Sequence, residues 1–337
     1  MFKDRENIIN AILGLLLATF IIGIIIQVKV YNAAERFKWR AAVTSTKGYT
    51  IQVAYSDFFH TGDSGSETDK SKILNEGYED KNFTQSGKDN SFYPDSLKIC
   101  WYSYDEQKFY EGNFALPYKQ ILTQANTLRT TTKEYNLDYP RPAPETVDLQ
   151  FVAEIAPQGK ITAWITDGGQ RLKIGGYKAT RVSQSWDIFR EYNPGADYYR
   201  NNTAAHTALV MEKHAYKIEV ILPEEMSVKT IDLTTFNQKN WKLEKGDDPT
   251  SAPFNYIPSD LELTWGTEGM TFSTQFAFRD SDVLAAFRKL QPQAGSAPVI
   301  LQIKVNDKND IVSLKLKNAK EEVLLKSDYP MEVRSRN

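Results

Sequence analysis

Cysteine and histidine are scarce in this sequence of 337 residues, which holds one cysteine and three histidines. The single cysteine, Cys100, cannot form an internal disulfide, and it cannot build a cysteine-rich zinc site. A surplus of positive charge is also missing, because 41 lysine and arginine residues face 43 aspartate and glutamate residues. Without a global basic field, we expect no nucleic-acid partner.

Sequence motifs for cofactor chemistry are absent as well. The chain has no glycine-rich phosphate loop, Walker motif or dinucleotide fingerprint. His206 and His214 are eight residues apart, a spacing that suits a metal pair neither on a helix nor on a strand. Asp307, Asn309 and Asp310 lack the further ligands of a calcium loop and read as a hairpin turn. We therefore predict no catalytic residue, no metal ligand and no cofactor.

A serine-hydrolase motif deserves a separate test. His60 precedes the tetrapeptide Gly62-Asp63-Ser64-Gly65, which resembles the surroundings of a nucleophilic serine. Such chemistry requires a base and an orienting acid that converge on the hydroxyl. The tetrapeptide lies in a polar stretch, residues 61–90, that reads as a long loop. We interpret Ser64 as a loop residue and keep the nucleophile as the alternative.

Long apolar runs are absent except for one near the N-terminus. Ile8 to Ile26 contains no charge and is interrupted only by Asn10 and Thr19. At about 1.5 Å per residue, this run can cross a hydrocarbon core of about 30 Å. It predicts an uncleaved single-pass anchor within residues 1–40, and a cleaved signal peptide is the alternative. Lysine and arginine are more numerous after the run, so the positive-inside rule favours a cytoplasmic globular part.

The rest of the chain repeats itself. Tyr49 to Tyr55 reads like Tyr216 to Leu222, and Pro94 to Trp101 reads like Pro258 to Trp265. Both pairs alternate apolar and polar residues, as half-buried strands do. We predict a tandem duplication in which the first strands correspond to one another, and so do the second strands. Phe109 is matched with Phe272 on the third strand.

Each copy continues with a helix and a hairpin. Apolar residues at the spacing i, i+1, i+4 and i+7 predict a helix from Ile121 to Leu128 and another from Val283 to Leu290. The fold class is α+β: an N-terminal transmembrane helix, then two duplicated domains of mainly antiparallel sheet, each with one covering helix. The domains are predicted at residues 41–184 and 206–337. Residues 185–205 form the connector, in which Trp186 and Phe189 share one side of a short helix.

One hairpin concentrates aromatic side chains. The cluster comprises Trp101, Tyr102, Tyr104, Phe109 and Tyr110. Aromatic clusters of this kind serve as binding surfaces in some proteins. They also form ordinary cross-strand pairs within sheets. We take these five residues as the candidate binding surface, with sheet packing as the alternative.

The segment from Pro94 to Ser103, with Lys108-Phe109-Tyr110, Leu116-Pro117-Tyr118 and Pro157 to Trp164, resembles the bacterial domain-of-unknown-function family 2931. The resemblance covers roughly residues 49–181. It implies an envelope protein of the kind found in Gram-negative bacteria, where members are lipoprotein-like. This chain has an apolar helix in place of a lipidated cysteine. The resemblance implies a periplasmic globular part on an inner-membrane anchor, against the count of positive charges.

These features favour a membrane-tethered, non-enzymatic binding protein of the bacterial envelope. Its partners would be the membrane, through Ile8 to Ile26, and another protein. A protein inhibitor or immunity-type factor is a specific case, since some relatives in the resembled family are thought to neutralise toxins. An envelope hydrolase with an unidentified site and a structural subunit of an envelope complex are the alternatives.

Overall fold

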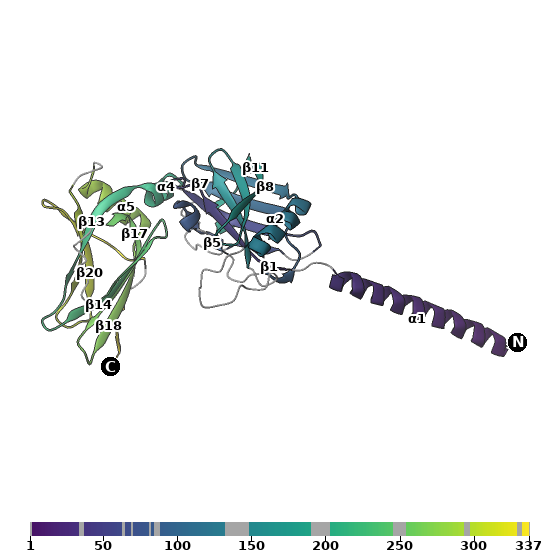
Figure 1. The fold of residues 1–337 in the computed structure, drawn as a ribbon. Helices are drawn as coiled ribbons and strands as arrows, with labels where there is room; N and C mark the ends of the chain where they lie inside the picture. Colours follow the sequence, from purple (N-terminus) through teal and green to yellow (C-terminus); the bar gives the residue numbers. More distant parts are fainter. Residues whose placement is uncertain are drawn as a thin grey trace.

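The computed structural model describes residues 2–33, 37–62, 65–68, 70–80, 82–83, 88–131, 148–189, 203–244, 254–292, 297–328 and 332–336. Its helices are α1 (Phe2–Ala33), α2 (Tyr118–Thr131), α4 (Thr203–Met211) and α5 (Asp280–Leu290), with 3-10 helices η1 (Gly77–Asp80) and η3 (Trp186–Phe189). Most of the remaining described residues lie in strands. The strands fall into two halves, and α1 extends from the first half on the side away from the second (Figure 1).

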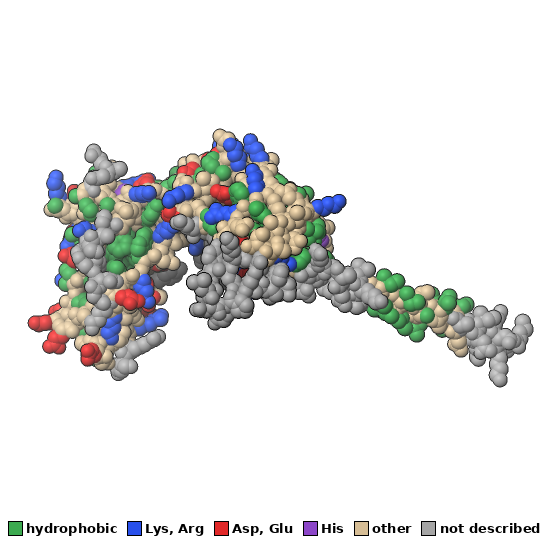
Figure 2. Space-filling model, in the orientation of Figure 1, with side chains coloured by type: hydrophobic (Ala, Val, Ile, Leu, Met, Phe, Trp, Pro, Cys, Tyr) green, Lys and Arg blue, Asp and Glu red, His purple; other side chains and the backbone are tan. Residues whose placement is uncertain are grey.

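Helix α1 exposes apolar side chains to its surroundings. Leu15 is 70% exposed and Phe20 is 68% exposed, and hydrophobic side chains cover the described part of this helix in Figure 2. Among the residues that the structure describes, no helix is both long enough and apolar enough to span a membrane. Within the predicted run from Ile8 to Ile26, the structure describes the side chains of all residues except 8, 9 and 11.

The first half is a sandwich of two sheets. One sheet has the strand order β11-β10-β9-β1-β5, with β6 also on β1, and the other has the order β12-β8-β7-β2-β3, with β4 also on β2. The principal strands are β1 (Phe37–Ser45), β2 (Ile51–Phe59), β7 (Ser96–Ser103), β8 (Lys108–Ala115), β9 (Leu149–Ala156), β10 (Lys160–Thr166), β11 (Arg171–Lys178) and β12 (Thr180–Val182). The short ones are β3 (Ser66–Glu67), β4 (Ile73–Leu74), β5 (Asn82–Phe83) and β6 (Lys88–Ser91).

The second half repeats this topology with one edge strand fewer in each sheet. Its sheets have the orders β16-β13-β19-β20-β21 and β15-β14-β17-β18-β22. The strands are β13 (Lys213–Ile221), β14 (Ser227–Thr235), β15 (Asn240–Glu244), β16 (Phe254–Tyr256), β17 (Pro258–Gly266), β18 (Thr271–Ala277), β19 (Val299–Val305), β20 (Val312–Lys317), β21 (Glu322–Leu324) and β22 (Arg334–Arg336). The two halves are therefore copies of one fold.

Packing between the two sheets explains each core. In the first half, Trp101 from one sheet and Phe151 from the other are fully buried in one cluster, to which α2 adds Ile121 and Leu128. In the second half, Trp265 is fully buried, and Phe287 of α5 is buried in the same core. Each amphipathic helix thus buries its apolar stripe in a core that the two sheets already form. The predicted single helix per copy is present, and it joins a sandwich instead of covering a lone sheet.

Two of the sheets are not purely antiparallel. Strand β1 pairs parallel with β9, and β13 pairs parallel with β19. After β1 the chain forms β2, β7 and β8 of the other sheet. It then passes through α2 and returns to the first sheet as β9, which lies beside β1. This crossover is why two strands that lie far apart in the sequence run in the same direction.

The predicted match between the second strands is confirmed by the pairing. Trp101 pairs with Tyr110, and Trp265 occupies the same place opposite Phe272. The third-strand match is wrong by one residue, because Tyr110 and not Phe109 is the counterpart of Phe272. Leu97 opposite Phe114 and Leu261 opposite Phe276 agree with the sequence comparison.

The predicted match between Tyr49–Tyr55 and Tyr216–Leu222 is wrong. The strand at Ile51 is β2, whose counterpart is β14, whereas Ile218 lies in β13, the counterpart of β1. Strand β1 begins at Phe37, so its first four residues lie in the segment that was predicted as anchor and juxtamembrane. Its side chains alternate between core and surface from Phe37 to Arg40 and are buried on both faces from Ala41 to Ser45, so the period-two pattern of a half-buried strand ends after four residues.

The polar stretch of residues 61–90 is more ordered than the sequence predicts. Within its described residues, β3 and β4 pair with β2, while β5 and β6 pair with β1. The hydroxyl of Thr44 donates to the carbonyl oxygen of Gly77, which ties η1 to the outer face of β1. The stretch therefore extends both sheets at one edge.

Candidate functional site

The five predicted aromatic residues are buried. Trp101 and Tyr110 point into the core between the sheets of the first half. Tyr102, Tyr104 and Phe109 point the other way, to the outer face of the sheet that contains β7 and β8, and are between 1% and 6% exposed. These side chains do not form an exposed binding surface, so that prediction is corrected to sheet packing on both faces.

The cover on this outer face comes from the chain itself. The ring centroids of Trp186 and Tyr102 are 4.6 Å apart, and those of Trp186 and Phe109 are 5.6 Å apart. Phe189 stacks on Phe109 at 6.0 Å. The connector thus places Trp186 and Phe189 on one side, as predicted. Large aromatic rings supply most of the apolar area that makes such a contact stable.

Helix α4 continues this cover. Val210 lies in the same buried cluster as Tyr102 and Tyr104. The Nε2 atom of His206 lies 2.8 Å from the hydroxyl of Tyr104. Burial lowers the pKa of His206 to about 3, so its imidazole is neutral near pH 7.

The three histidines do not form a metal site. His214 contacts Glu212 through its Nε2 atom at 3.1 Å, and Glu212 also pairs with Arg288 of α5. His206 instead faces Tyr104. Within the described part of the chain, no group of three histidine, cysteine, aspartate or glutamate side chains is arranged to hold a metal ion.

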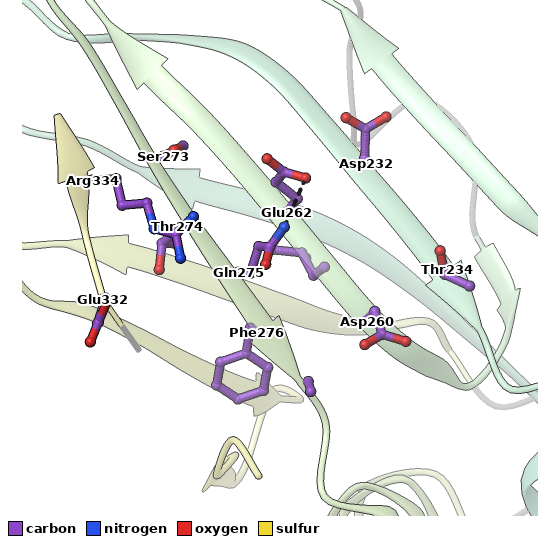
Figure 3. Close-up of a pocket in the computed structure, with 12 residues that line it drawn as sticks. Asp232, Thr234, Asp260, Glu262, Ser273, Thr274, Gln275, Phe276, Glu332 and Arg334 are labelled. Atoms are coloured by element: carbon purple, nitrogen blue, oxygen red, sulfur yellow. Dashed lines mark hydrogen bonds between the residues drawn. The ribbon is translucent and has the colours of Figure 1, made fainter. Parts of the chain in front are cut away.

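The second half carries an open hollow on the outer face of its β14–β17–β18 sheet. The hollow has a volume of about 470 Å³ and is shown in Figure 3. Four carboxylates and one guanidinium line it: Asp232, Asp260, Glu262, Glu332 and Arg334. Carboxylates in excess over cations make this surface suited to lysine and arginine side chains of a partner.

Cross-strand register sets the positions of these carboxylates. Asp232 on β14 lies directly opposite Glu262 on β17, which lies opposite Gln275 on β18. The amide nitrogen of Gln275 donates to the carboxylate of Glu262 at 3.3 Å. Like charges directly opposite one another on a sheet are destabilising. The second half retains this unfavourable pair on an open face.

The equivalent positions of the first half hold a complementary pair. Asp57 on β2 lies opposite Lys98 on β7, where the second half has Asp232 opposite Glu262. The position of Asp260 is taken by Ser96. The exchange of Lys98 for Glu262 lies in the second strands, which were matched correctly. Its partner was not visible, because only a match of β2 with β14 sets Asp232 opposite Glu262 as Asp57 is opposite Lys98.

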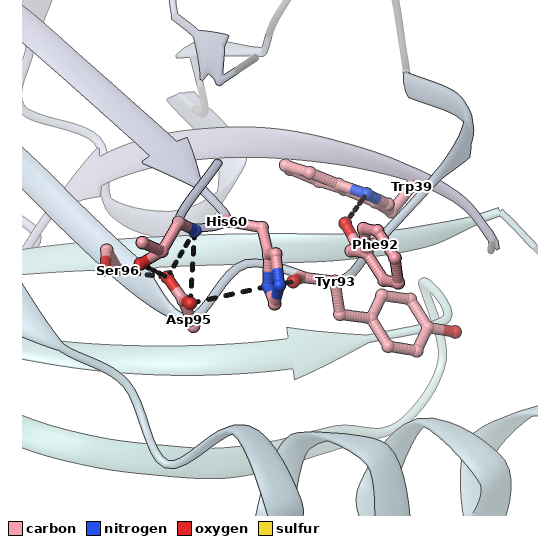
Figure 4. A network of polar contacts seen from close by, with 7 residues as sticks. Trp39, His60, Phe92, Tyr93, Asp95 and Ser96 are labelled. Atoms are coloured by element: carbon pink, nitrogen blue, oxygen red, sulfur yellow. Dashed lines mark hydrogen bonds and ion pairs between the residues drawn. The ribbon is translucent and has the colours of Figure 1, made fainter. Parts of the chain in front are cut away.

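A histidine, an aspartate and a serine meet at the edge of the first half (Figure 4). The Nδ1 atom of His60 lies 3.1 Å from the carbonyl oxygen of Tyr93 and 3.5 Å from Asp95. The hydroxyl of Ser96 donates to Asp95 at 2.8 Å, and the amide of Thr61 donates to the same carboxylate. The serine is therefore bonded to the acid and not to the base, unlike the order in a hydrolase triad.

None of the remaining sequence candidates is placed in a described catalytic or metal-binding arrangement. Ser64, the alternative nucleophile, lies outside the described residues. Asn309 has a φ of 57° in the turn between β19 and β20, and its side chain accepts a hydrogen bond from the indole of Trp265 at 2.8 Å. Cys100 is fully buried, and burial, aided by Glu111, raises its pKa to about 12. This thiol is unreactive in the folded chain.

Comparison with known families covers the first half and its connector. The family model described as a protein of unknown function (DUF2931) matches residues 27–208, which is more than half of the chain. The chain belongs to the DUF2931 family. The match is longer than the resemblance seen in the sequence and ends within α4, so it includes η3, whose rings cover Tyr102 and Phe109. The acidic hollow lies beyond it. No curated protein shows a significant match to the chain.

Proposed function

We propose that this chain is a membrane-tethered, non-enzymatic binding protein whose acidic hollow receives basic side chains of a protein partner. One observation carries the proposal. The outer face of the second half is open and acidic at Asp232, Asp260 and Glu262, whereas the first half pairs Asp57 with Lys98 at the equivalent positions and covers the rest of that face with its own connector. A protein inhibitor or immunity-type factor of the bacterial envelope is a specific case of this function.

The negative charge of the hollow indicates which side chains the partner must present. Asp260 is exposed, and Asp232 and Glu262 are partly exposed on neighbouring strands. A lysine or arginine of the partner would relieve the repulsion between Asp232 and Glu262 while forming ion pairs with both. Binding of a basic side chain here is therefore more favourable than at a surface whose carboxylates are already neutralised.

The tether is supported by the N-terminal sequence. Ile8 to Ile26 carries no charge, and the described side chains of α1 in this range are exposed and mostly apolar. We place the anchor in the inner membrane and the globular part in the periplasm. Alkaline carbonate washing of membranes tests the tether: the chain should remain in the pellet, and its release would contradict an integral anchor.

A co-purification experiment tests the binding function. The full-length chain, extracted in detergent from the envelope, should bring down one protein partner in a stoichiometric amount. The double substitution Asp260→Asn and Glu262→Gln should remove the partner, because it removes two charges at nearly constant shape. Lys98→Gln, at the equivalent position of the first half, is the matched control and should leave recovery unchanged. Recovery at background level from the unaltered chain would refute the proposal.

A further inference from the structure

The acidic hollow lies at an edge of its sheet, beside β22. This strand pairs with three residues of β18, Thr271 to Ser273, whereas β17 pairs with β18 along its whole length. Figure 3 shows Arg334 of β22 beside Ser273. Residues 332–336 are called the C-terminal arm, and within it Val333 packs partly buried against the core of the second half. An edge strand this short forms few main-chain hydrogen bonds, so its release from the sheet costs little free energy.

Two attachments hold the C-terminal segment to β18, and they do not belong to one continuous ladder. The amide of Asp328 donates to the carbonyl oxygen of Ala277 at 3.0 Å, and Arg334 pairs with Ser273. Between these attachments β18 has three residues and the C-terminal segment has five, so the pairing slips by two residues. Within the described part of the chain, the middle of β18 therefore pairs with a strand on one side, where β17 lies.

The C-terminal arm matches the charge of the hollow poorly. Glu332 and Arg334 are two residues apart, so they share one face of an extended chain, and both are exposed and line the hollow. Continuing the register of β22 by two residues sets position 332 against Gln275. Gln275 lies in one row with Glu262 and Asp232. The arm thus brings one cation and one further anion to an acidic face, and like charges on neighbouring strands repel.

A strand from a partner can match this edge better than the chain's own arm. Strand addition to a sheet edge uses main-chain hydrogen bonds for affinity and alternate side chains for specificity. A strand with lysine or arginine at every second position would set one cation against Ser273, as Arg334 does. It would set the next against Gln275, where the register of the arm brings Glu332. Both cations would then face the carboxylates of the hollow, so the two surfaces would be complementary in charge.

We propose that the acidic hollow receives its partner as an extended segment with a basic residue at every second position, which replaces β22 at the edge of β18. The C-terminal arm is then an intramolecular competitor, which holds this edge until such a segment displaces it. The inference rests on the proposed binding function, because it concerns the same hollow. It adds how the partner is held and which sequence pattern the partner carries.

A reversible disulfide tests the replacement of β22. Ser273 and Arg334 are paired on antiparallel strands, where the Cα atoms of opposite residues are about 4.5–5.5 Å apart and within reach of a disulfide. The double substitution Ser273→Cys and Arg334→Cys therefore locks β22 in place when oxidised and releases it when reduced. Cys100 is fully buried, and Cys100→Ala in the same chain removes it from thiol exchange. The lock leaves every carboxylate of the hollow in place.

The probe is a short fluorescent threonine peptide with arginine at every second position. Its binding to the full-length chain in detergent is followed by fluorescence anisotropy. The reduced variant should bind it at least about tenfold more tightly than the oxidised variant, because a locked edge cannot accept a strand. A peptide of the same composition with its arginines in one block is the matched control, and it should bind both forms equally weakly. Deletion of residues 332–337 from the otherwise unaltered chain should raise the affinity for the alternating peptide at least about tenfold, because it removes the competitor.

The results separate this inference from the binding function on which it rests. Equal affinity of the oxidised and reduced forms for the alternating peptide would overturn strand replacement. If Asp260→Asn with Glu262→Gln still removed that binding, the proposed function would stand. Equal affinity for the alternating and block peptides would overturn the sequence pattern in the same way. No binding of either peptide to the reduced variant and to the shortened chain would refute the inference and the acidic hollow as a site for basic side chains. If the cysteine variant does not fold, the deletion decides, and an unchanged affinity after it would overturn the inference.

Discussion

The two halves share one fold but use the outer face of their equivalent sheets in opposite ways. On the first half, Tyr102 and Phe109 lie under Trp186 and Phe189 of the connector. On the second half, the same face carries Asp232, Asp260 and Glu262 and is open, at positions where the first half has Asp57, Ser96 and the exposed Lys98. The cores between the sheets are alike, with Trp101 and Trp265 at matched positions. The fold thus constrains the inward residues, whereas the outward residues decide whether a face is covered or offered to a partner.

The largest expected contrast concerns stability. Trp186→Ala should lower the free energy of unfolding by about 3–5 kcal/mol, because it removes a buried ring that covers Tyr102 and Phe109. Gln275→Ala, on the open face, should change it by less than about 0.5 kcal/mol. Urea unfolding followed by circular dichroism measures both. Equal midpoints for the two variants would show that the first face is not held closed by the connector.

Two thiols at equivalent positions, one on each face, should react at very different rates. Thr264 is the counterpart of Cys100 and is half-buried. At pH 8, burial and then Glu111 keep the pKa of Cys100 near 12, so little thiolate is present. Cysteine introduced as Thr264→Cys in a Cys100→Ala background should react with iodoacetamide at least about 100-fold faster. Comparable rates would contradict the contrast between covered and open faces.

An intermediate effect is expected at the edge of the first half. Asp95 is partly buried, which raises its pKa, but hydrogen bonds from Ser96 and Thr61 outweigh burial and lower it overall. Asp95→Asn should cost about 1–2 kcal/mol of unfolding free energy at pH 7. A carboxyl with a lowered pKa stabilises the fold above its unfolded pKa of about 3.9 and loses that effect as the pH falls through the folded value. The cost should therefore shrink at pH 3 in urea titrations.

Ser259→Ala is the control for Asp95→Asn, since Ser259 follows Pro258 as Asp95 follows Pro94. The second half has no carboxylate at that position. The difference between pH 7 and pH 3 should therefore be absent in this variant, and a pH-independent cost of Asp95→Asn would refute the assigned role of the carboxylate.

The smallest expected effect is the most specific to the acidic hollow. Glu262→Lys places a lysine opposite Asp232, as Lys98 lies opposite Asp57 in the first half. This change should stabilise the chain by about 0.2–1 kcal/mol, and Lys98→Glu should destabilise it by a similar amount. Salt should reduce both differences. Changes of the same sign in the two variants would rule out the cross-strand explanation.

Much of the fold could be predicted from the sequence, at strands of which only one face is buried. Pro94 to Trp101 and Pro258 to Trp265 alternate apolar and polar residues, and the match between them is confirmed. The hairpin that closes each copy was also predicted, and it is formed by β9 with β10 and by β19 with β20. Strand β1 was missed, because the alternation of Phe37 to Arg40 ends where both faces become covered, from Ala41 to Ser45.

The use of each face was harder to predict. An aromatic run such as Tyr102, Tyr104 and Phe109 indicates a surface that will be buried, but not what buries it. Here the cover lies more than seventy residues further along the chain, at Trp186 and Phe189. The acidic hollow required the correct pairing of β14 with β17, because Asp232 lies beside Glu262 only across strands.

The contact between Trp186 and Tyr102 tests the account most directly, since it decides whether the first face is covered. Nuclear Overhauser spectroscopy of the full-length chain in detergent at pH 7.5 reports proton pairs within about 5 Å. The ring centroids are 4.6 Å apart, so strong cross-peaks between the indole and phenol ring protons are predicted. Assigned rings with no cross-peak between them would contradict the account.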